Sequence, residues 1–399
     1  MRSRRSAYQR LRSDWDDDRP ATTILRARAY LLGYPADDVT WARLGCLLAG
    51  LARYEEARAA LATGARIWEG REHRPLAFLL VWIGDSYERE GDFPAAEIWY
   101  RRAVEAAPDH QVGYGCLGRL LCRWGRLAEA EAIGQRAVRC DRGLPEQAWL
   151  ELGFVLRAQG RYAEAARCFR KSLAFDPDGG AAKLALADVE AAQRCERHGI
   201  WREGRGEAYE RMRRQLREGM PAQNALLARR YLEECPHNFA VWTSLGQELS
   251  RLCRHEEARV ALARGAGLAD GEGRTKAAWI NDAWTGRAYE RCGNYTAAES
   301  WYRRAIQTAP DNASGYVFLG ALLAHWGRFD EAAVVHRGGT TCATGRVDES
   351  WLNLGYVLRA QERFGDALVC FREVLRIGPD YEVAKQAIDD VKAAMTFKR

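Results

Sequence analysis

The sequence predicts an all-α protein in which helix-turn-helix units stack into a solenoid. Residues 149–178 ("WLELGFVLRAQGRYAEAARCFRKSLAFDPD") and 351–380 ("WLNLGYVLRAQERFGDALVCFREVLRIGPD") are identical at 17 of 30 positions, at an offset of 202. Within each segment, apolar residues follow helical spacing in two runs of about a dozen residues. A short polar turn, "GRY" or "ERF", separates the two runs. Each segment therefore predicts a pair of antiparallel helices.

The same correspondence extends along most of the chain. "EEARAALA" at 55–62 matches "EEARVALA" at 256–263, and "RAYLLGYP" at 28–35 matches "RRYLEECP" at 229–236. Repetition over a block of about 200 residues indicates an internal duplication. We therefore expect two arrays, residues 1–199 and residues 200–399, each with five units and a final capping helix.

Shorter repeats place the units within each block. Units are expected to begin near residues 38, 77, 111 and 146, and again near 239, 279, 313 and 348. Segments 4–37 and 205–238 fit two degenerate units that keep Pro35 and Pro236. Helices near 178–196 and 381–395 are expected to cover the open ends of the stacks, as terminal units must. Three glycines between the arrays predict a hinge: Gly199, Gly204 and Gly206.

Each unit carries small residues at fixed places. In residues 80–109 the pattern consists of Gly84, Tyr87, Ala96, Tyr100, Ala103 and Pro108. The glycine of the first helix and the alanine of the second are small because the two helices cross closely there, and a larger side chain would separate them. The proline ends the second helix, since it lacks an N–H and disfavours a helical residue before it.

This pattern resembles the tetratricopeptide repeat, a unit of about 34 residues. The resemblance implies a right-handed superhelix whose first helices line a concave groove. Carried onto this chain, the groove residues are Trp82, Asp85, Arg89, Arg119, Arg123, Arg157, Arg251, Trp284, Arg287, Arg291, His325, Tyr356 and Arg359. Arginines with interleaved aromatic residues suit an extended, acidic peptide, because the guanidinium group binds carboxylates through two hydrogen bonds.

The leading functional hypothesis is a non-enzymatic scaffold or adaptor that holds a protein or peptide partner in one or both grooves. A second hypothesis is a helical-repeat protein that binds nucleic acid, which the arginines and aromatic residues permit. The net charge of only +6, from 60 basic and 54 acidic residues, argues against it. A third hypothesis is a bacterial sensor of signalling peptides.

Motifs for catalysis or cofactor binding are missing from the sequence. It contains no HExxH, P-loop or GxSxG pattern and no paired metal-ligand motif. We therefore expect no enzyme activity, no cofactor and no metal. The eleven cysteines form no CxxC pair, which is typical of reduced cysteines in a core. With no apolar run of about 18 residues, no membrane span is expected, and the cytoplasm is the expected compartment.

One helix differs between the two blocks. "AEAEAIGQRAVRC" at 128–140 corresponds to "DEAAVVHRGGTTC" at 330–342, where Gly338 and Gly339 replace Arg136 and Ala137. Each helical glycine costs roughly 1 kcal/mol relative to alanine. The sequence therefore predicts that this helix frays or breaks near Gly338.

Overall fold

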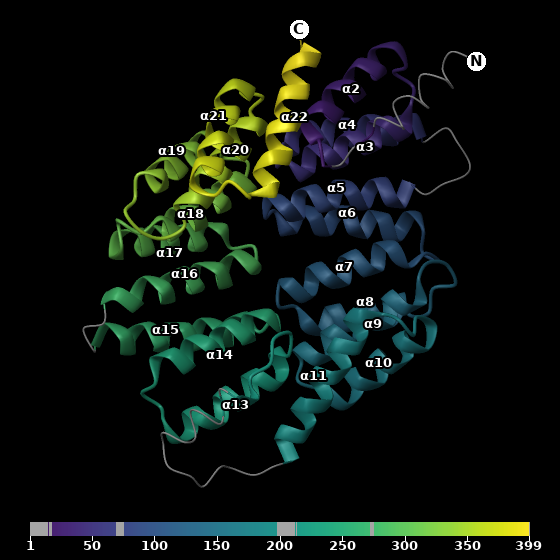
Figure 1. The fold of residues 1–399 in the computed structure, drawn as a ribbon. Coiled ribbons are helices and arrows are strands. Elements are labelled where there is room, and N and C mark those ends of the chain that lie inside the picture. The colour runs from purple at the N-terminus through teal and green to yellow at the C-terminus, as the bar shows by residue number, and fades with distance from the viewer. Residues whose placement is uncertain are drawn as a thin grey trace. The chain divides into compact units, whose positions relative to one another are not determined.

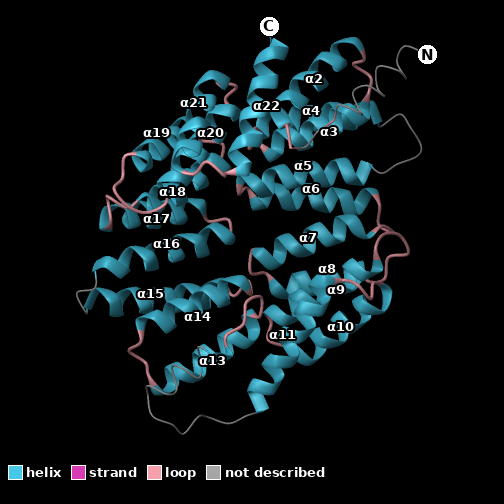
Figure 2. Cartoon of the chain, in the orientation of Figure 1, coloured by secondary structure: helices cyan, strands magenta, loops and turns pink. Residues whose placement is uncertain are grey.

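The computed structural model describes residues 15, 18–68, 76–197, 212, 214–271 and 275–398. Every regular element in these ranges is an α-helix (Figures 1 and 2). The all-α fold of stacked helix pairs that the sequence predicts is confirmed. Within the same ranges, no helix combines the length and apolarity needed to cross a bilayer.

The helices belong to two compact units, one formed by Met1–Trp99 with Ala309–Arg399 and the other by Tyr100–Thr308. We call them the terminal unit and the central unit. The terminal unit contains α2 (Pro20–Gly33), α3 (Asp38–Gly50), α4 (Tyr54–Trp68), α5 (Leu76–Glu90), α18 (Ala313–His325), α19 (Phe329–Thr340), α20 (Val347–Ala360), α21 (Phe364–Ile377) and α22 (Glu382–Lys398).

The central unit contains α7 (Gln111–Arg123), α8 (Leu127–Ala137), α9 (Pro145–Ala158), α10 (Tyr162–Phe175), α11 (Gly180–Arg197), α13 (Pro221–Glu234), α14 (Phe239–Arg251), α15 (His255–Gly271), α16 (Thr275–Arg291) and α17 (Tyr295–Thr308). The boundary between the units falls within α6 (Phe93–Ala106). Each compact unit therefore takes helices from both sequence blocks, and the division at residues 199 and 200 stays a prediction about the sequence.

A glycine in the first helix of several pairs lets the second helix approach closely. A Cβ atom on Gly153 of α9 would lie 2.4 Å from the ring of Phe169 in α10. In the matching pair, a Cβ atom on Gly355 would lie 2.5 Å from the ring of Phe371. Both phenylalanine rings are completely buried. The predicted reason for the small residue is thus confirmed, because an aromatic ring of the partner helix occupies the space beside the glycine.

The turns between paired helices contain a residue with positive φ. Glycine occupies this place in the α7–α8 and α9–α10 turns, at Gly125 (φ 81°) and Gly160 (φ 79°). In three other turns a residue with a side chain adopts the same left-handed conformation: Ala52 (φ 57°), Cys253 (φ 58°) and Glu362 (φ 59°). These side chains are held in a conformation that favours glycine.

The helices expected to cover the ends of the stacks each carry a further helix on the opposite side. In the terminal unit, α22 packs against both α21 and α2 (Figure 1). In the central unit, α11 packs against both α10 and α13. The last helix of each sequence block is therefore covered by a helix from the other block: α2 covers α22, and α13 covers α11.

The prediction of a break near Gly338 is wrong. Helix α19 continues through both glycines to Thr340. A Cβ atom on Gly338 would lie 2.8 Å from the ring of Tyr316, and one on Gly339 would lie 2.4 Å from the Oγ of Ser350. The helix is stabilised by this close packing against α18 and α20, which outweighs the low helix propensity of glycine. The hinge predicted at Gly199, Gly204 and Gly206 lies outside the described residues.

Candidate functional site

A cavity of about 330 Å³ lies in the central unit, between α7, α9 and the α14–α15 turn. Four of the arginines predicted from the sequence line it: Arg119, Arg123, Arg157 and Arg251. Because two of them come from α7 and the others from α9 and α14, the cavity is built from both sequence blocks. We call it the central cavity.

Arg157 is held in a fixed orientation at the wall of the central cavity. Its Nη1 lies 3.1 Å from Oδ2 of Asp188, a side chain with no exposed area. Its guanidinium carbon lies 4.9 Å from the ring centre of Phe154, which also lines the cavity. A cation at this distance from an aromatic ring is attracted to its face. Phe154 thus supplies both an apolar surface and part of the support for Arg157.

Positive charge accumulates beside the central cavity. Burial lowers the pKa of Arg291, and the neighbouring Arg287 and Arg251 lower it further. Arg251 itself donates to Glu248 over 3.1 Å. The guanidinium carbon of Arg287 lies 5.5 Å from the ring centre of Trp284. The charge of Arg251 therefore acts on Arg291 of α16, although none of the predicted α16 residues lines the cavity itself.

One acid, Glu151, opposes these arginines. It lies beside Gly115, where a Cβ atom would be 2.8 Å from the Oε2 of Glu151. Burial raises the pKa of Glu151, while a hydrogen bond from Gln147 and the charge of Arg119 act in the opposite direction. The missing side chain at Gly115 therefore makes room for a carboxyl group in an otherwise cationic wall.

A second cavity, of about 460 Å³, lies in the terminal unit. His325, Tyr356 and Arg359, all predicted from the sequence, line it. Arg359 lies 4.9 Å from the ring centre of Tyr356, and its Nη1 lies 3.3 Å from Oδ2 of Asp390. Burial lowers the pKa of Arg359, and the charge of Asp390 opposes this shift. We call this the terminal cavity.

The two cavities occupy matching places in the repeats but differ in charge. At the offset of 202, Tyr356 and Arg359 correspond to Phe154 and Arg157. In contrast, Arg119 corresponds to Ala321 and Arg123 to His325 in the terminal cavity, so the terminal cavity has fewer permanent positive charges. The central and terminal cavities therefore have the same place in the repeats but different charge.

Three predicted residues, Trp82, Asp85 and Arg89, do not line either cavity. They lie on α5, and Trp82 packs against a buried apolar cluster that includes Leu61 and Ile83. This tryptophan therefore contributes to the core between neighbouring helix pairs. A role for Trp82, Asp85 and Arg89 in a binding groove stays a prediction.

Several cavity residues are absent from the set predicted from the sequence. Cys122 and Cys253 line the central cavity, while Asn353 and His336 line the terminal cavity. Cys253 lies in a turn and His336 in a second helix, outside the positions that line tetratricopeptide grooves, whereas Cys122 and Asn353 lie in first helices. Asp188 was also missed, although "DVEAA" at 188–192 and "DVKAA" at 390–394 form a visible signal.

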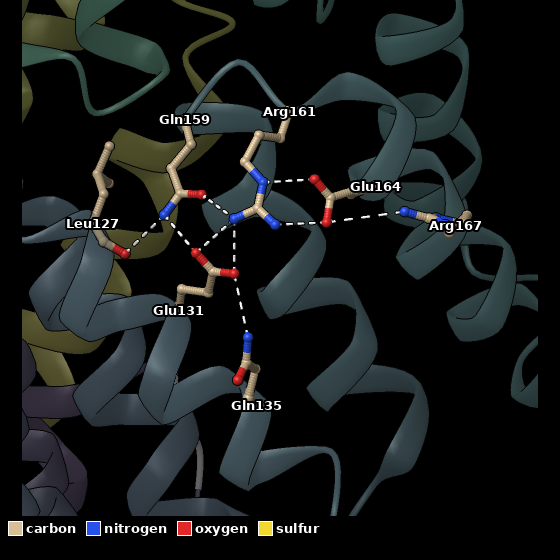
Figure 3. Close-up of polar contacts among 7 residues, drawn as sticks. All are labelled: Leu127, Glu131, Gln135, Gln159, Arg161, Glu164 and Arg167. Carbon is tan, nitrogen blue, oxygen red and sulfur yellow. Dashed lines mark hydrogen bonds and ion pairs between the residues drawn. The ribbon is translucent and has the colours of Figure 1, made fainter.

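Arginines away from the cavities stabilise the helix starts. Figure 3 shows Arg161, which donates to Glu164 three residues later and to Glu131 of α8. Gln159 donates to the same Glu131 and to the carbonyl of Leu127. Matching pairs three residues apart begin other second helices: Arg53–Glu56, Arg126–Glu129, Arg254–Glu257, Arg328–Glu331 and Arg363–Asp366. Part of the arginine content therefore stabilises the helices of the repeats.

Among the described residues, no group of three His, Cys, Asp or Glu side chains is placed to hold a metal ion.

The chain is similar to known repeat proteins over several segments. Models of the tetratricopeptide repeat match residues 42–110, 146–178, 286–315 and 352–378. Tetratricopeptide repeat protein 7B of Homo sapiens is 26% identical over 147 residues, which are 37% of this chain and 17% of the human protein. The chain thus spans a small part of that relative's length.

Solved structures with similar folds include a tetratricopeptide repeat protein of Parabacteroides merdae, with 17% identity, a TM-score of 0.33, and coverage of 69% of this chain and 96% of the other. Pseudomonas aeruginosa pilF shares 16% identity over 60% of this chain and 95% of its own, with a TM-score of 0.33. The P58(IPK) TPR domain shares 13% identity over 81% of this chain and 99% of its own, with a TM-score of 0.29.

These TM-scores are low, so the family assignment depends on the repeat matches and on the glycine-centred helix pairs. The matched segments include both members of the pair that first revealed the repeat, near residues 149–178 and 351–380. The chain therefore contains tetratricopeptide repeats in both of its sequence blocks.

Proposed function

We propose that this protein is a non-enzymatic adaptor whose two cavities hold segments of partner proteins. Tetratricopeptide repeats generally mediate protein–protein interaction. The proposal that the cavities bind partner segments is supported by the placement of Arg119, Arg123, Arg157 and Arg251 around one cavity. A peptide with acidic side chains or a free carboxyl end fits this wall, because charge-assisted hydrogen bonds to arginine are short and strong.

Two cavities of different charge would let one adaptor hold two kinds of segment. The terminal cavity offers His325, Tyr356 and Arg359 in place of the arginine cluster, and therefore suits a less acidic segment. When one partner carries both segments, binding of the first raises the effective concentration of the second. The cytoplasm is the proposed compartment, which the eleven free cysteines support.

The proposal is tested with fluorescent peptides of matched length that are rich in either Asp or Asn. The wild-type protein is expected to bind the acidic peptide more tightly. In the variant Arg119→Glu/Arg123→Glu, affinity for that peptide is expected to fall tenfold or more, since a hydrogen bond to a charged group contributes about 1.5–3 kcal/mol. Fluorescence anisotropy at constant ionic strength measures the change.

The matched control is Arg136→Glu/Arg139→Glu, which makes the same charge change on exposed residues of the α8 region. Equal loss of affinity in both variants would mean that net charge, and not the cavity, attracts the peptide. Binding of single-stranded DNA in preference to the acidic peptide, with affinity falling steeply as salt increases, would instead favour a nucleic-acid-binding protein.

A further inference from the structure

Two cysteines from different sequence blocks meet in the central cavity. Cys122 belongs to the last turn of α7 and is 8% exposed, while Cys253 follows α14 and is half-buried. Both side chains line the cavity, and each thiol acts on the pKa of the other. The two sulfur atoms are therefore close in space although the residues are 131 positions apart.

The backbone holds Cys253 in place. Its φ of 58° lies in the left-handed region, where the matching turns contain Gly125 and Gly160. Its N–H donates to the carbonyl of Ser250 over 3.2 Å. The conformation of this turn therefore fixes the backbone of Cys253 at the wall of the cavity.

The surroundings make the two thiols chemically unequal. The hydrogen bond from Cys122 lowers the pKa of Cys253 well below its ordinary value, against the effect of burial, and His255 and Arg123 lower it further. The same hydrogen bond, together with burial, raises the pKa of Cys122. A thiol that ionises more readily than the thiol beside it is the arrangement of a reactive cysteine and its resolving partner.

Several other cysteines lie in a different environment. Burial raises the pKa of five of them: Cys140, Cys168, Cys292, Cys342 and Cys370. In the terminal cavity, alanines stand at the places that match the pair, Ala324 for Cys122 and Ala52 for Cys253. The pair is thus confined to one of two otherwise matching cavities.

We propose that Cys253 and Cys122 form a dithiol that small hydroperoxides oxidise to a disulfide across the central cavity. Cys253 is the residue that attacks the peroxide, and Cys122 is the residue that resolves the product. The bond would join the end of α7 to the turn after α14, at the wall that also contains Arg123 and Arg251. This chemistry requires no bound partner and does not depend on the proposed adaptor function.

The reaction balances with hydrogen peroxide as the oxidant. The thiolate of Cys253 attacks one peroxide oxygen, the O–O bond breaks, and hydroxide leaves while a sulfenic acid forms on Cys253. Cys122 then gives up its proton and its sulfur attacks the sulfenyl sulfur. The S–O bond breaks with loss of a second hydroxide, and the disulfide forms. The two hydroxides become two molecules of water by taking up the proton from Cys122 and the proton that Cys253 released when it ionised. The two sulfurs lose two electrons, which the peroxide gains.

The test uses the full chain, fully reduced and then treated with one molar equivalent of hydrogen peroxide. Peptide mass mapping without reductant is expected to find the Cys122 peptide linked to the Cys253 peptide, with the loss of two hydrogens. A thiol reductant should reverse the link. In Cys122→Ala, Cys253 should persist as a sulfenic acid and react with dimedone. In Cys253→Ala, Cys122 should remain reduced.

Both variants should fold, because alanine occupies the matching places in the terminal unit. Cys168→Ala, which removes a buried cysteine elsewhere in the central unit, is the matched control and should leave the link unchanged. The proposal is overturned if peroxide oxidises the exposed Cys46 before the pair, or if Cys253 takes up no dimedone in Cys122→Ala.

Discussion

Arg359 of α20 and Asp390 of α22 form an ion pair inside the terminal unit, with 3.3 Å between Nη1 and Oδ2. The Asp390 side chain has no exposed area. Its carboxylate also accepts hydrogen bonds from the backbone N–H groups of Ala21 and Thr22, over 3.2 and 3.1 Å. One acid therefore pairs a buried arginine and satisfies N–H groups in the first turn of α2, which have no partner within the helix.

The central unit contains the same arrangement at matching positions. Asp188 pairs with Arg157 and accepts hydrogen bonds from the N–H groups of Ala222 and Gln223, over 3.3 and 3.1 Å. Burial raises the pKa of Asp188, and the hydrogen bond from Gln223 and the charge of Arg157 oppose that shift. A buried carboxylate thus joins the last helix of each block to a helix of the other block, α22 to α2 and α11 to α13.

Replacement of this acid is expected to destabilise the terminal unit. Asp390→Ala leaves Arg359 buried without its counterion and leaves the N–H groups of Ala21 and Thr22 without an acceptor. Removing one partner of a buried ion pair costs about 3–5 kcal/mol. Urea denaturation monitored by circular dichroism measures the loss, and Asp389→Ala, which changes an exposed neighbour, should have little effect. Equal stability of the two variants would contradict the buried pairing.

Two glycines of the α20–α21 pair should respond in opposite directions to replacement by alanine. Gly355→Ala places a Cβ atom 2.5 Å from the ring of Phe371, and overpacking of this kind typically costs about 1–3 kcal/mol. Gly365 has no atom within 4 Å of the same position, and alanine already occupies the matching place, Ala163. Gly365→Ala should therefore stabilise the helix by about 0.5–1 kcal/mol. Thermal unfolding of both variants provides the comparison, and destabilisation by Gly365→Ala would count against it.

The sequence predicts the helix pairs well because their signal is local. Gly153 and Phe169 lie 16 positions apart, and the same spacing separates Gly355 and Phe371. The contact between α22 and α2 has no such local signal. Apolar spacing in residues 381–395 predicts which face of the helix is buried, but not that α2, more than 350 positions earlier, covers it.

Prediction of the cavity residues is limited for a related reason. Positions in the first helix of a repeat point to Arg119, Arg157 and Arg359, which line the two cavities, and their role in binding stays a prediction. They cannot identify Cys253, which enters the central cavity from a turn of the other block, because that approach depends on how α11 and α13 pack. Trp82 has the right periodicity but is packed in the core, since spacing alone does not distinguish a ring in a groove from one between units.

Gly339 and Ser350 should behave as a coupled pair. A Cβ atom on Gly339 would lie 2.4 Å from the Oγ of Ser350, whereas the matching residues Ala137 and Ala148 coexist in the central unit. Gly339→Ala alone is therefore expected to cost about 1 kcal/mol or more through overpacking. Adding Ser350→Ala should recover most of that loss, giving a coupling energy of about 0.5–3 kcal/mol in a double-mutant cycle. Additive effects of the two changes would show that the contact is absent in solution.

His336 should make the terminal unit sensitive to mild acid. Its ring has no exposed area and fills the space beside Gly320, where a Cβ atom would lie 2.4 Å from it. Neither ring nitrogen has a hydrogen-bond partner among the described residues. Burial lowers the pKa of His336 to about 4. Between pH 4 and the ordinary value near 6.5, the unfolded chain therefore binds a proton that the folded protein does not.

The free energy of unfolding is accordingly expected to rise with pH across this window, and to fall by about 3 kcal/mol on acidification through it. His336→Leu keeps an apolar group beside Gly320 and removes the titration, so its stability profile should be flatter than that of the wild type between pH 4 and 6.5. His237→Leu changes an exposed ring and should keep the wild-type slope. Urea denaturation at closely spaced pH values compares the three proteins, and parallel profiles for wild type and His336→Leu would rule out His336 as the source of the acid sensitivity.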